Sequence, residues 1–191
     1  MMIGQNSNSV NILSKIPPNT IGAEIGVWKG DTSELFLKNV NPIELHLVDP
    51  WSFDAFANNL SEKEYKKELE KYSKITNGTD KKSFEDYYDK IYNGVKIRFS
   101  SYTNVTIHRK ISTEWFNTFD KKLDWIYIDG DHTYDGCLND LNNCLKVMKK
   151  KSIIFGDDYG NKPDVKRAVD YFSKNRNLTI LGKNQFMIEI K

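Results

Sequence analysis

Short apolar runs alternate along the chain with longer segments in which apolar residues recur at helical spacing. Apolar runs that end in polar turn residues are typical of buried parallel strands, and the amphipathic segments between them are typical of helices that cover a sheet. The predicted strands begin near residues 21, 44, 105, 123, 152, 178 and 186. A glycine-containing turn and a helix follow the first strand, and the second strand ends in an acid. This order predicts an α/β fold with a Rossmann-like, doubly wound sheet and helices on both of its faces.

Amphipathic spacing also predicts the helices. The most regular apolar face predicts one long helix and consists of Tyr134, Leu138, Leu141, Leu145 and Met148. Further helices are expected near residues 10–16, 31–40, 61–72, 84–99, 114–119 and 163–172. We expect the long helix to bury its apolar face against the sheet.

The chain of 191 residues is expected to form a single domain over residues 1–191, without internal repeats or linkers. A helical insertion is predicted at about 52–104, between the second and third strands. This crossover is longer than the sheet requires. Such insertions form either a lid or substrate wall, or a passive elaboration of the surface, and the sequence leaves both interpretations open.

Charge and cysteine content exclude several classes of protein. The 28 basic and 26 acidic residues leave a net charge of +2, so neither a nucleic-acid partner nor a membrane partner is predicted. No apolar run approaches the ~20 residues of a membrane span, and the polar N-terminus does not resemble a signal peptide. Cys137 and Cys144 lie on one predicted helix with Cα atoms roughly 10 Å apart, beyond disulfide reach. Two lone thiols of this kind predict a cytoplasmic protein.

Polar residues follow two neighbouring strands of the predicted sheet. Asp129, Asp131 and His132 follow the strand that begins at 123, and Asp157 and Asp158 follow the next one. The carboxyl ends of parallel strands are the edge at which open α/β sheets bind ligands. Carboxylates gathered there repel one another unless a cation or protons neutralise them, and oxygen ligands without cysteine favour magnesium. The alternative is that the second acidic pair only caps a loop.

Four motifs carry a resemblance to a known family. They are Glu24–Ser33, Val48–Trp51, Asp129–Tyr134 and Gly156–Tyr159. In this order and spacing they resemble class I S-adenosylmethionine-dependent methyltransferases, especially the small-molecule O-methyltransferase branch that includes the macrocin and mycinamicin sugar methyltransferases. The resemblance covers nearly the whole chain. It implies a seven-stranded sheet that is mostly parallel, with an antiparallel last strand inserted beside the fifth.

The resemblance implies S-adenosylmethionine as the methyl donor. In such a site, glycines let the backbone approach the methionine end of the donor, a buried acid helps to hold its amino-acid end, and the acid after the second strand binds the ribose hydroxyls. The implied donor-binding residues are Glu24, Gly26, Gly30, Ser33, Asp49, Ser112 and Asp129. Ser112 matches the position that contacts adenine, although a serine at a strand end is also a common cap.

Two tryptophans stand in the donor-binding motifs. Trp28 replaces the second glycine of many methyltransferases, so its side chain is expected to point away from the cofactor. Trp51 either flanks the adenine or the substrate, or packs in the core.

The resemblance also implies a catalytic arrangement. A hydroxyl is a poor nucleophile until its proton is withdrawn, and the family's metal ligands fall on Asp129, Asp157 and Asp158. His132 matches the general base of the mycinamicin-type enzymes, and Asp131 matches the base of relatives without that histidine, so both are candidates. The expected acceptor is a hydroxyl group of a sugar or another small polyol-like molecule. The oligomeric state is left open, with a homo-oligomer among the options.

Two other classes of protein use a similar sheet. A nicotinamide-dependent oxidoreductase is disfavoured because the turn after the first strand lacks the Gly-x-Gly-x-x-Gly spacing. A non-catalytic cofactor-binding protein is disfavoured because unneutralised acids at the strand ends would destabilise a sheet that had no use for them.

Overall fold

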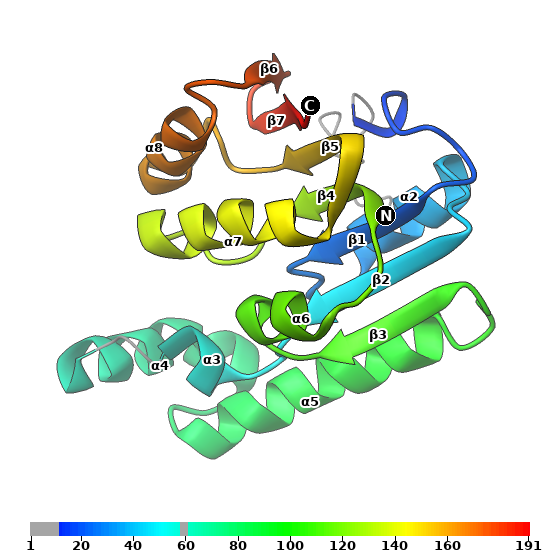
Figure 1. Cartoon of the computed structure of the whole chain (residues 1–191). Coiled ribbons are helices and arrows are strands. Elements are labelled where there is room, and N and C mark those ends of the chain that lie inside the picture. Colours follow the sequence, from blue (N-terminus) through cyan, green and yellow to red (C-terminus); the bar gives the residue numbers. More distant parts are fainter. Residues whose placement is uncertain (1–11, 58–60) are drawn as a thin grey trace.

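The computed structural model describes residues 12–57 and 61–191, and it contains a seven-stranded sheet in the order β3-β2-β1-β4-β5-β7-β6 (Figure 1). The strands are β1 (Ile21–Ile25), β2 (Glu44–Asp49), β3 (Val105–Arg109), β4 (Leu123–Ile128), β5 (Met148–Gly156), β6 (Asn177–Leu181) and β7 (Gln185–Glu189). β7 pairs antiparallel with β5 and with β6, whereas the other five strands pair in parallel. The predicted doubly wound sheet, with its antiparallel last strand beside the fifth, is therefore confirmed.

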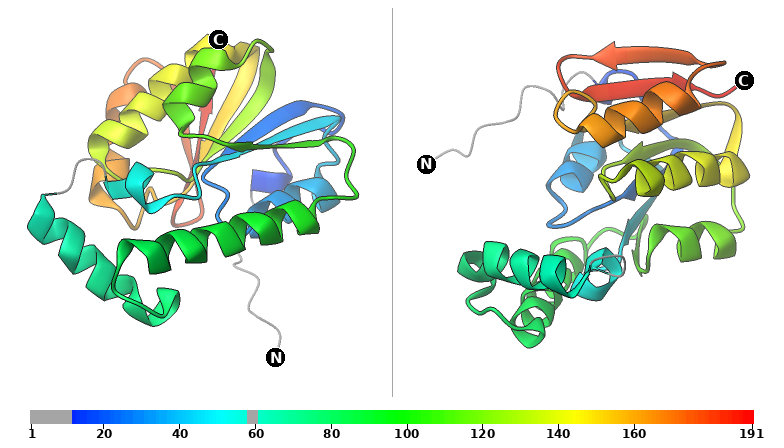
Figure 2. Two further views of the ribbon diagram at one scale, coloured as in Figure 1. Left: turned by 90° about the horizontal axis from the view of Figure 1, so that it is seen from below. Right: turned by 90° about the vertical axis from the view of Figure 1, so that its left-hand side faces the viewer.

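Helices cover both faces of the sheet (Figures 1 and 2). On one face lie α6 (Ser112–Thr118), α7 (Tyr134–Val147) and α8 (Pro163–Phe172). On the other face lie α2 (Asp31–Asn39) and α5 (Lys81–Arg98). Each face has its own cluster of buried side chains, so the strands between them are apolar on both sides, as expected for a sheet of buried parallel strands.

Strand β4 shows how one apolar run supplies both cores. Successive side chains of a strand point to opposite faces of the sheet. Trp125 and Tyr127 accordingly join the core beneath α2 and α5, whereas Ile126 and Ile128 join the core beneath α6, α7 and α8. All four side chains are buried. The strand is therefore fixed from both sides, and the loop that follows it starts from a rigid position.

The predicted insertion between β2 and β3 consists of α3 (Phe53–Ala57), α4 (Glu62–Thr76) and α5. The short helix α3 and the 15-residue helix α4 project beyond the carboxyl ends of the strands (Figure 1). A capping box formed by Ser61 and Glu64 begins α4. Phe53, Leu69 and Phe84 form a small core of their own, separate from the two cores of the sheet. The insertion is thus a folded unit in which α5 is shared with the sheet.

The buried face of α7 differs from the predicted one. Leu145 is 40% exposed, and Met148 is the first residue of β5 rather than part of the helix. Tyr134, Leu138 and Leu141 pack in or against the core as predicted, and Cys137 and Cys144, which were not expected there, are buried with them. Both are free thiols, in agreement with the prediction that they form no disulfide.

The predicted N-terminal helix lies partly outside the described residues. Val10 is among the residues that are not described, whereas Ile16 is buried against the core beneath α2. No helix in the described part of the chain combines the length and the apolarity needed to cross a membrane.

Candidate functional site

The ends of four strands meet at one edge of the sheet. In the ladder, Ile25 pairs with Val48 on one side and with Ile128 on the other, and Ile128 pairs with Gly156. The residues that follow these strands therefore emerge at one level. The chain order reverses between β1 and β4, and such a switch point at the carboxyl ends of strands is where open α/β sheets bind ligands.

The turn after β1 requires glycine for reasons internal to the protein. Gly26 has a φ of 89°, and a Cβ atom there would lie 2.0 Å from the backbone oxygen of Asp129. Gly30 has a φ of 79°, and its Cβ would lie 2.6 Å from the ring of Phe99. Both positions combine a left-handed backbone with close packing, which only glycine tolerates. A role for these glycines in donor binding stays a prediction.

Asp49 holds this turn in place. Its Oδ2 accepts hydrogen bonds from the backbone N–H groups of Val27 at 3.0 Å and Trp28 at 2.9 Å, and its Oδ1 accepts one from Trp51 at 2.7 Å. Burial raises the pKa of the Asp49 carboxyl, although the three N–H groups oppose this shift. A carboxylate has about four acceptor sites, so capacity remains for further donors such as hydroxyl groups.

Glu24 is a buried acid beneath the same turn. Its side chain is 1% exposed, and the Ser33 hydroxyl donates a hydrogen bond to its Oε2. Burial raises the pKa of Glu24 well above its ordinary value, and the nearby carboxylates of Asp129 and Asp49 raise it further. A buried carboxylate without a cation destabilises a fold. The sequence therefore retains an acid where an amide or an apolar side chain would suit the fold better, which points to a functional role.

Ser112 contacts a buried acid that the sequence analysis missed. The Ser112 hydroxyl donates a hydrogen bond of 2.5 Å to Oδ1 of Asp140, which lies on α7 and is buried. Burial raises the pKa of Asp140 to about 7. The available signal in the sequence was an acid at helical spacing between Cys137 and Cys144, within the apolar face of a helix.

His132 lies between two carboxylates at the ends of β4 and β5. Its Nε2 is 3.1 Å from Oδ2 of Asp158 and 3.5 Å from Oδ1 of Asp129. The potential ligand atoms of these three residues all lie within 4.8 Å of one another, close enough to share a metal ion. We call this group the rim cluster. The structure thus brings together two of the three predicted metal ligands, with the histidine as the third member.

Asp157 stands outside the rim cluster. Its Oδ2 accepts a hydrogen bond of 3.1 Å from the Tyr127 hydroxyl, and its Oδ1 accepts one of 2.8 Å from the backbone N–H of Asp158. These contacts hold its carboxylate against the end of β5. Its negative charge nevertheless contributes to the raised pKa of Asp129, whose main cause is burial.

The two candidate bases have different surroundings. The hydrogen bond to Asp129 raises the pKa of His132, and the charge of Asp158 adds to this shift. Asp131 is exposed instead, and its Oδ1 accepts a hydrogen bond of 2.8 Å from the backbone N–H of Thr133 just before α7. The imidazole of His132 is therefore the candidate that takes part in the rim cluster, whereas Asp131 stabilises the loop.

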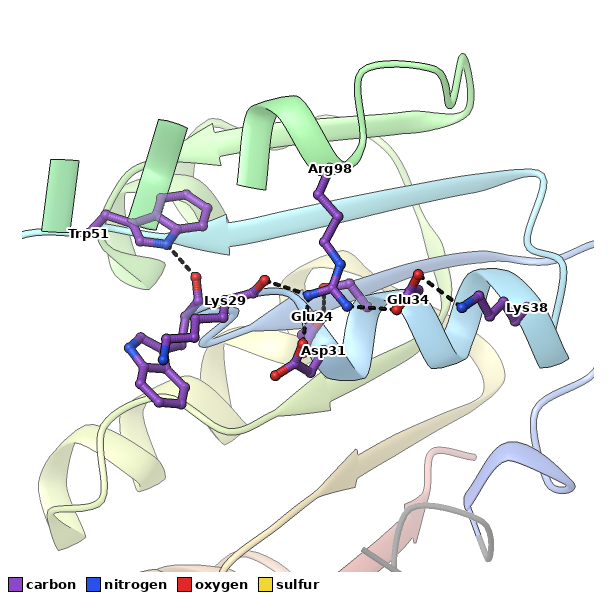
Figure 3. Close-up of polar contacts among 9 residues, drawn as sticks. Glu24, Lys29, Asp31, Glu34, Lys38, Trp51 and Arg98 are labelled. Carbon is purple, nitrogen blue, oxygen red and sulfur yellow. Dashed lines mark hydrogen bonds and ion pairs between the residues drawn. The ribbon is translucent and has the colours of Figure 1, made fainter. Parts of the chain in front are cut away.

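The two tryptophans near the turn have separate roles. Trp51 is fully buried, and its Nε1 donates a hydrogen bond of 2.8 Å to the backbone oxygen of Trp28 (Figure 3). Its ring packs on Tyr92 in the core beneath α2 and α5. Trp28 is 51% exposed. Of the two interpretations left open for Trp51, the structure supports packing in the core.

A small cavity lies among the rim residues. It measures about 10 Å³ and is lined by residues that include Asp129, His132 and Asp157. A cavity of this size holds about one water molecule. A bound donor would therefore lie outside this cavity or displace rim side chains.

Comparisons with known proteins bear on the family and the fold of the chain. A family model described as a methyltransferase domain matches residues 23–159. The structure of SMU.1697c from Streptococcus mutans in complex with SAH is 12% identical, with a TM-score of 0.60 and coverage of 98% of this chain and 99% of that chain. The O-methyltransferase NovP is 15% identical, with a TM-score of 0.58 and coverage of 96% and 76%.

Fibrillarin of Aeropyrum pernix with natively bound S-adenosyl-L-methionine is 7% identical, with a TM-score of 0.55 and coverage of 91% of this chain and 66% of that chain. Among the curated proteins none matches the chain. At these identities the likeness to the solved structures shows the fold, whereas the family match covers most of the chain.

Proposed function

Because the chain belongs to the methyltransferase domain family, we propose that it transfers a methyl group from S-adenosylmethionine to a hydroxyl group of a small molecule, with a sugar or glycan-type compound as the acceptor. The observation that carries this proposal is the position of His132 between Asp129 and Asp158, beside the turn after β1. A base, a pair of acids and a glycine turn at one sheet edge suit the activation of a hydroxyl group next to a bound cofactor. Free, buried Cys137 and Cys144 favour a reducing compartment, and we place the reaction in the cytoplasm.

The residues around the turn fit the chemical groups of the donor. Bound S-adenosylmethionine supplies an electrophilic methyl group on a sulfonium. The buried Glu24 carboxylate offers a partner for the cationic amino-acid end, and a cation there would offset the cost of burying this acid. Asp49 retains acceptor capacity for ribose hydroxyl groups. Ser112, whose hydroxyl donates a hydrogen bond to Asp140, is proposed to make a polar contact with the adenine.

His132 is proposed as the group that removes the proton of the acceptor hydroxyl. A histidine is suited to this task because its side chain changes charge in the physiological pH range, and the flanking carboxylates, which raise the pKa of His132, stabilise the imidazolium that forms. Because these carboxylates raise the pKa of His132 above its ordinary value, the neutral base is lost as the pH falls through the raised pKa. The rate is therefore expected to rise as the pH increases through the raised pKa of His132 and to level off above it. A cation held by Asp129 and Asp158 would oppose their effect on this pKa and move the rise to lower pH.

Asp129 and Asp158 are proposed to hold a divalent cation, and magnesium suits their oxygen ligands. Such an ion would lower the pKa of a bound acceptor hydroxyl group and neutralise the two carboxylates. Asp157, which the resemblance also implies as a ligand, would act indirectly by fixing the backbone of Asp158.

The donor is tested by direct titration. The purified protein is expected to bind S-adenosylhomocysteine with a dissociation constant in the micromolar range or below, and to show no saturable binding of NAD(H) or NADP(H). Isothermal titration calorimetry of both ligand classes provides the measurement. The opposite preference would reject the methyltransferase proposal in favour of the oxidoreductase alternative.

The metal is tested with two matched variants. Asp158→Asn is expected to raise the magnesium concentration needed for half-maximal turnover by roughly 10-fold to 100-fold. Asp157→Asn is expected to raise it less, since the Asp157 side chain binds Tyr127 and the backbone. Titration of magnesium at saturating donor, after treatment with a chelator, measures both. Turnover unaffected by the chelator would remove the cation from the mechanism, and the reverse order of the two variants would make Asp157 the ligand.

A further inference from the structure

A second cavity lies away from the strand ends. It measures about 490 Å³ and lies between α5, the last turn of α4 and the turn after β1. Its walls include Lys29, Ile75, Tyr87, Lys90, Gly94 and Arg98. We call it the α5 groove. None of the predicted donor-binding, metal-binding or catalytic residues lines it, so it is separate from the site described above. Its volume falls within the range of about 300–1,000 Å³ that is usual for small-molecule sites.

One side of the α5 groove is apolar. Ile91 and Val95 are buried side chains of α5 that form its floor. Ile75, near the end of α4, is 56% exposed, although it is a large aliphatic residue. Tyr87 adds an aromatic wall. Together these side chains offer a surface for an aliphatic or aromatic body of limited size.

The charged residues of the groove divide into a clamp and two lysines, of which Lys29 places its ammonium 4.2 Å from the centroid of the Trp28 ring. Arg98 donates hydrogen bonds to the backbone oxygen of Lys29 at 2.9 Å and to Asp31 and Glu34, each at 2.6 Å (Figure 3). This clamp ties the end of α5 to the start of α2, and its charge is neutralised by two acids. In the described part of the chain, neither Lys29 nor Lys90 forms an ion pair with an acid.

Gly94 stands in the interior of α5 without a structural reason for glycine. A Cβ atom at this position would meet no atom within 4 Å, and its φ lies outside the left-handed region. Glycine within a helix is destabilising relative to alanine. The position faces open space beside the groove. A large side chain at this position would fill that space, whereas a methyl group would not.

We propose that the α5 groove binds a small amphipathic anion: a ligand with one carboxylate, sulfonate or phosphate group attached to an apolar ring or chain. The anionic group would pair with Lys90 and with Lys29, whose ammonium would leave the Trp28 ring to do so. The apolar body would lie on Ile91 and Val95, and the space beside Gly94 would admit it. The site does not depend on the proposed methyl transfer, because its binding is measured without donor or acceptor.

Anilinonaphthalene sulfonate serves as the probe, since it combines one sulfonate with an aromatic body. The folded wild-type protein is expected to bind it saturably at a single site, as measured by the rise in probe fluorescence. Phenylnaphthylamine, the uncharged counterpart, is expected to bind at least tenfold more weakly, because it lacks the group that pairs with the lysines.

Three variants locate the probe. Gly94→Phe fills the groove and is expected to weaken probe binding at least tenfold, and Lys90→Gln is expected to weaken it about tenfold. Lys96→Gln is the matched control on the same helix, because Lys96 lies over the ring of Tyr92 and does not line the groove, and it is expected to leave the affinity unchanged.

Cooperative thermal unfolding of each variant establishes that the probe reports a folded protein, since partly folded states also bind this dye. Gly94→Ala, which adds only a methyl group at an exposed helical position, provides a second folded variant with the groove still open, and it is expected to bind the probe. The proposal is overturned if the wild type shows no saturable binding, if Gly94→Phe binds as well as Gly94→Ala, or if the uncharged probe binds as tightly as the anionic one.

Discussion

Replacing His132 with alanine is expected to lower kcat by roughly 100-fold or more, with little change in the affinity for S-adenosylhomocysteine. The side chain contributes a proton acceptor at the ends of β4 and β5, and its contacts are with Asp129 and Asp158 rather than with the turn after β1. Single-turnover kinetics at saturating donor separate the chemical step from binding. The pH profile of the remaining activity should lose the limb that the raised pKa of His132 produces.

Asp131→Ala is the matched control for this experiment. Asp131 lies next to His132 in the chain, but its carboxylate accepts a hydrogen bond from the backbone of Thr133 and is exposed. We expect a loss of loop stability and only a modest loss of rate. A normal rate for His132→Ala together with a large loss for Asp131→Ala would transfer the role of the base to Asp131.

Replacing Asp49 with alanine is expected to weaken donor binding by roughly 100-fold. Hydrogen bonds to a charged group contribute about 1.5–3 kcal/mol each, and a ribose presents two hydroxyl groups to this carboxylate. The backbone N–H groups of Val27, Trp28 and Trp51 would also lose their acceptor. Part of the loss would therefore come from a less ordered turn.

Asp49→Asn separates these two causes. The amide keeps the size of the side chain and one acceptor oxygen, so the turn should be disturbed less than in the alanine variant, while the charge that favours hydroxyl donors is lost. Calorimetric titration with S-adenosylhomocysteine and a thermal unfolding curve are measured for both. Unchanged affinity in a variant that unfolds like the wild type would remove Asp49 from the donor site.

Periodicity was sufficient to predict the sheet and most of the helices, because burial on both faces gives strands such as β4 a continuous apolar run. Periodicity failed where an apolar side chain is exposed or a polar one is buried. In α7, the exposed Leu145 was expected to be buried, whereas the buried face contains Cys137, Asp140 and Cys144. The short helix α3 was also missed, since five residues give too few turns for a helical period to be visible.

The candidate site was predictable as a set of strand ends but not as a set of contacts. Motif spacing placed Asp129, His132, Asp157 and Asp158 at one edge, and the register of β4 and β5 confirms that their strands are neighbours. Which carboxylate faces the histidine depends on side-chain direction. The carboxylate of Asp157 is bound by the hydroxyl of Tyr127, which lies on the preceding strand, rather than by His132. A linear sequence does not encode such a direction in any simple pattern.

The separate aromatic core of the insertion has an evolutionary consequence. Phe53, Leu69 and Phe84 pack with one another, and α4 contacts the remainder of the protein mainly through α5. Substitutions or changes of length in α3 and α4 would thus leave the packing of the sheet almost untouched. Variation in α3 and α4 is therefore expected to be tolerated by the sheet, except where α4 lines the α5 groove at Ile75.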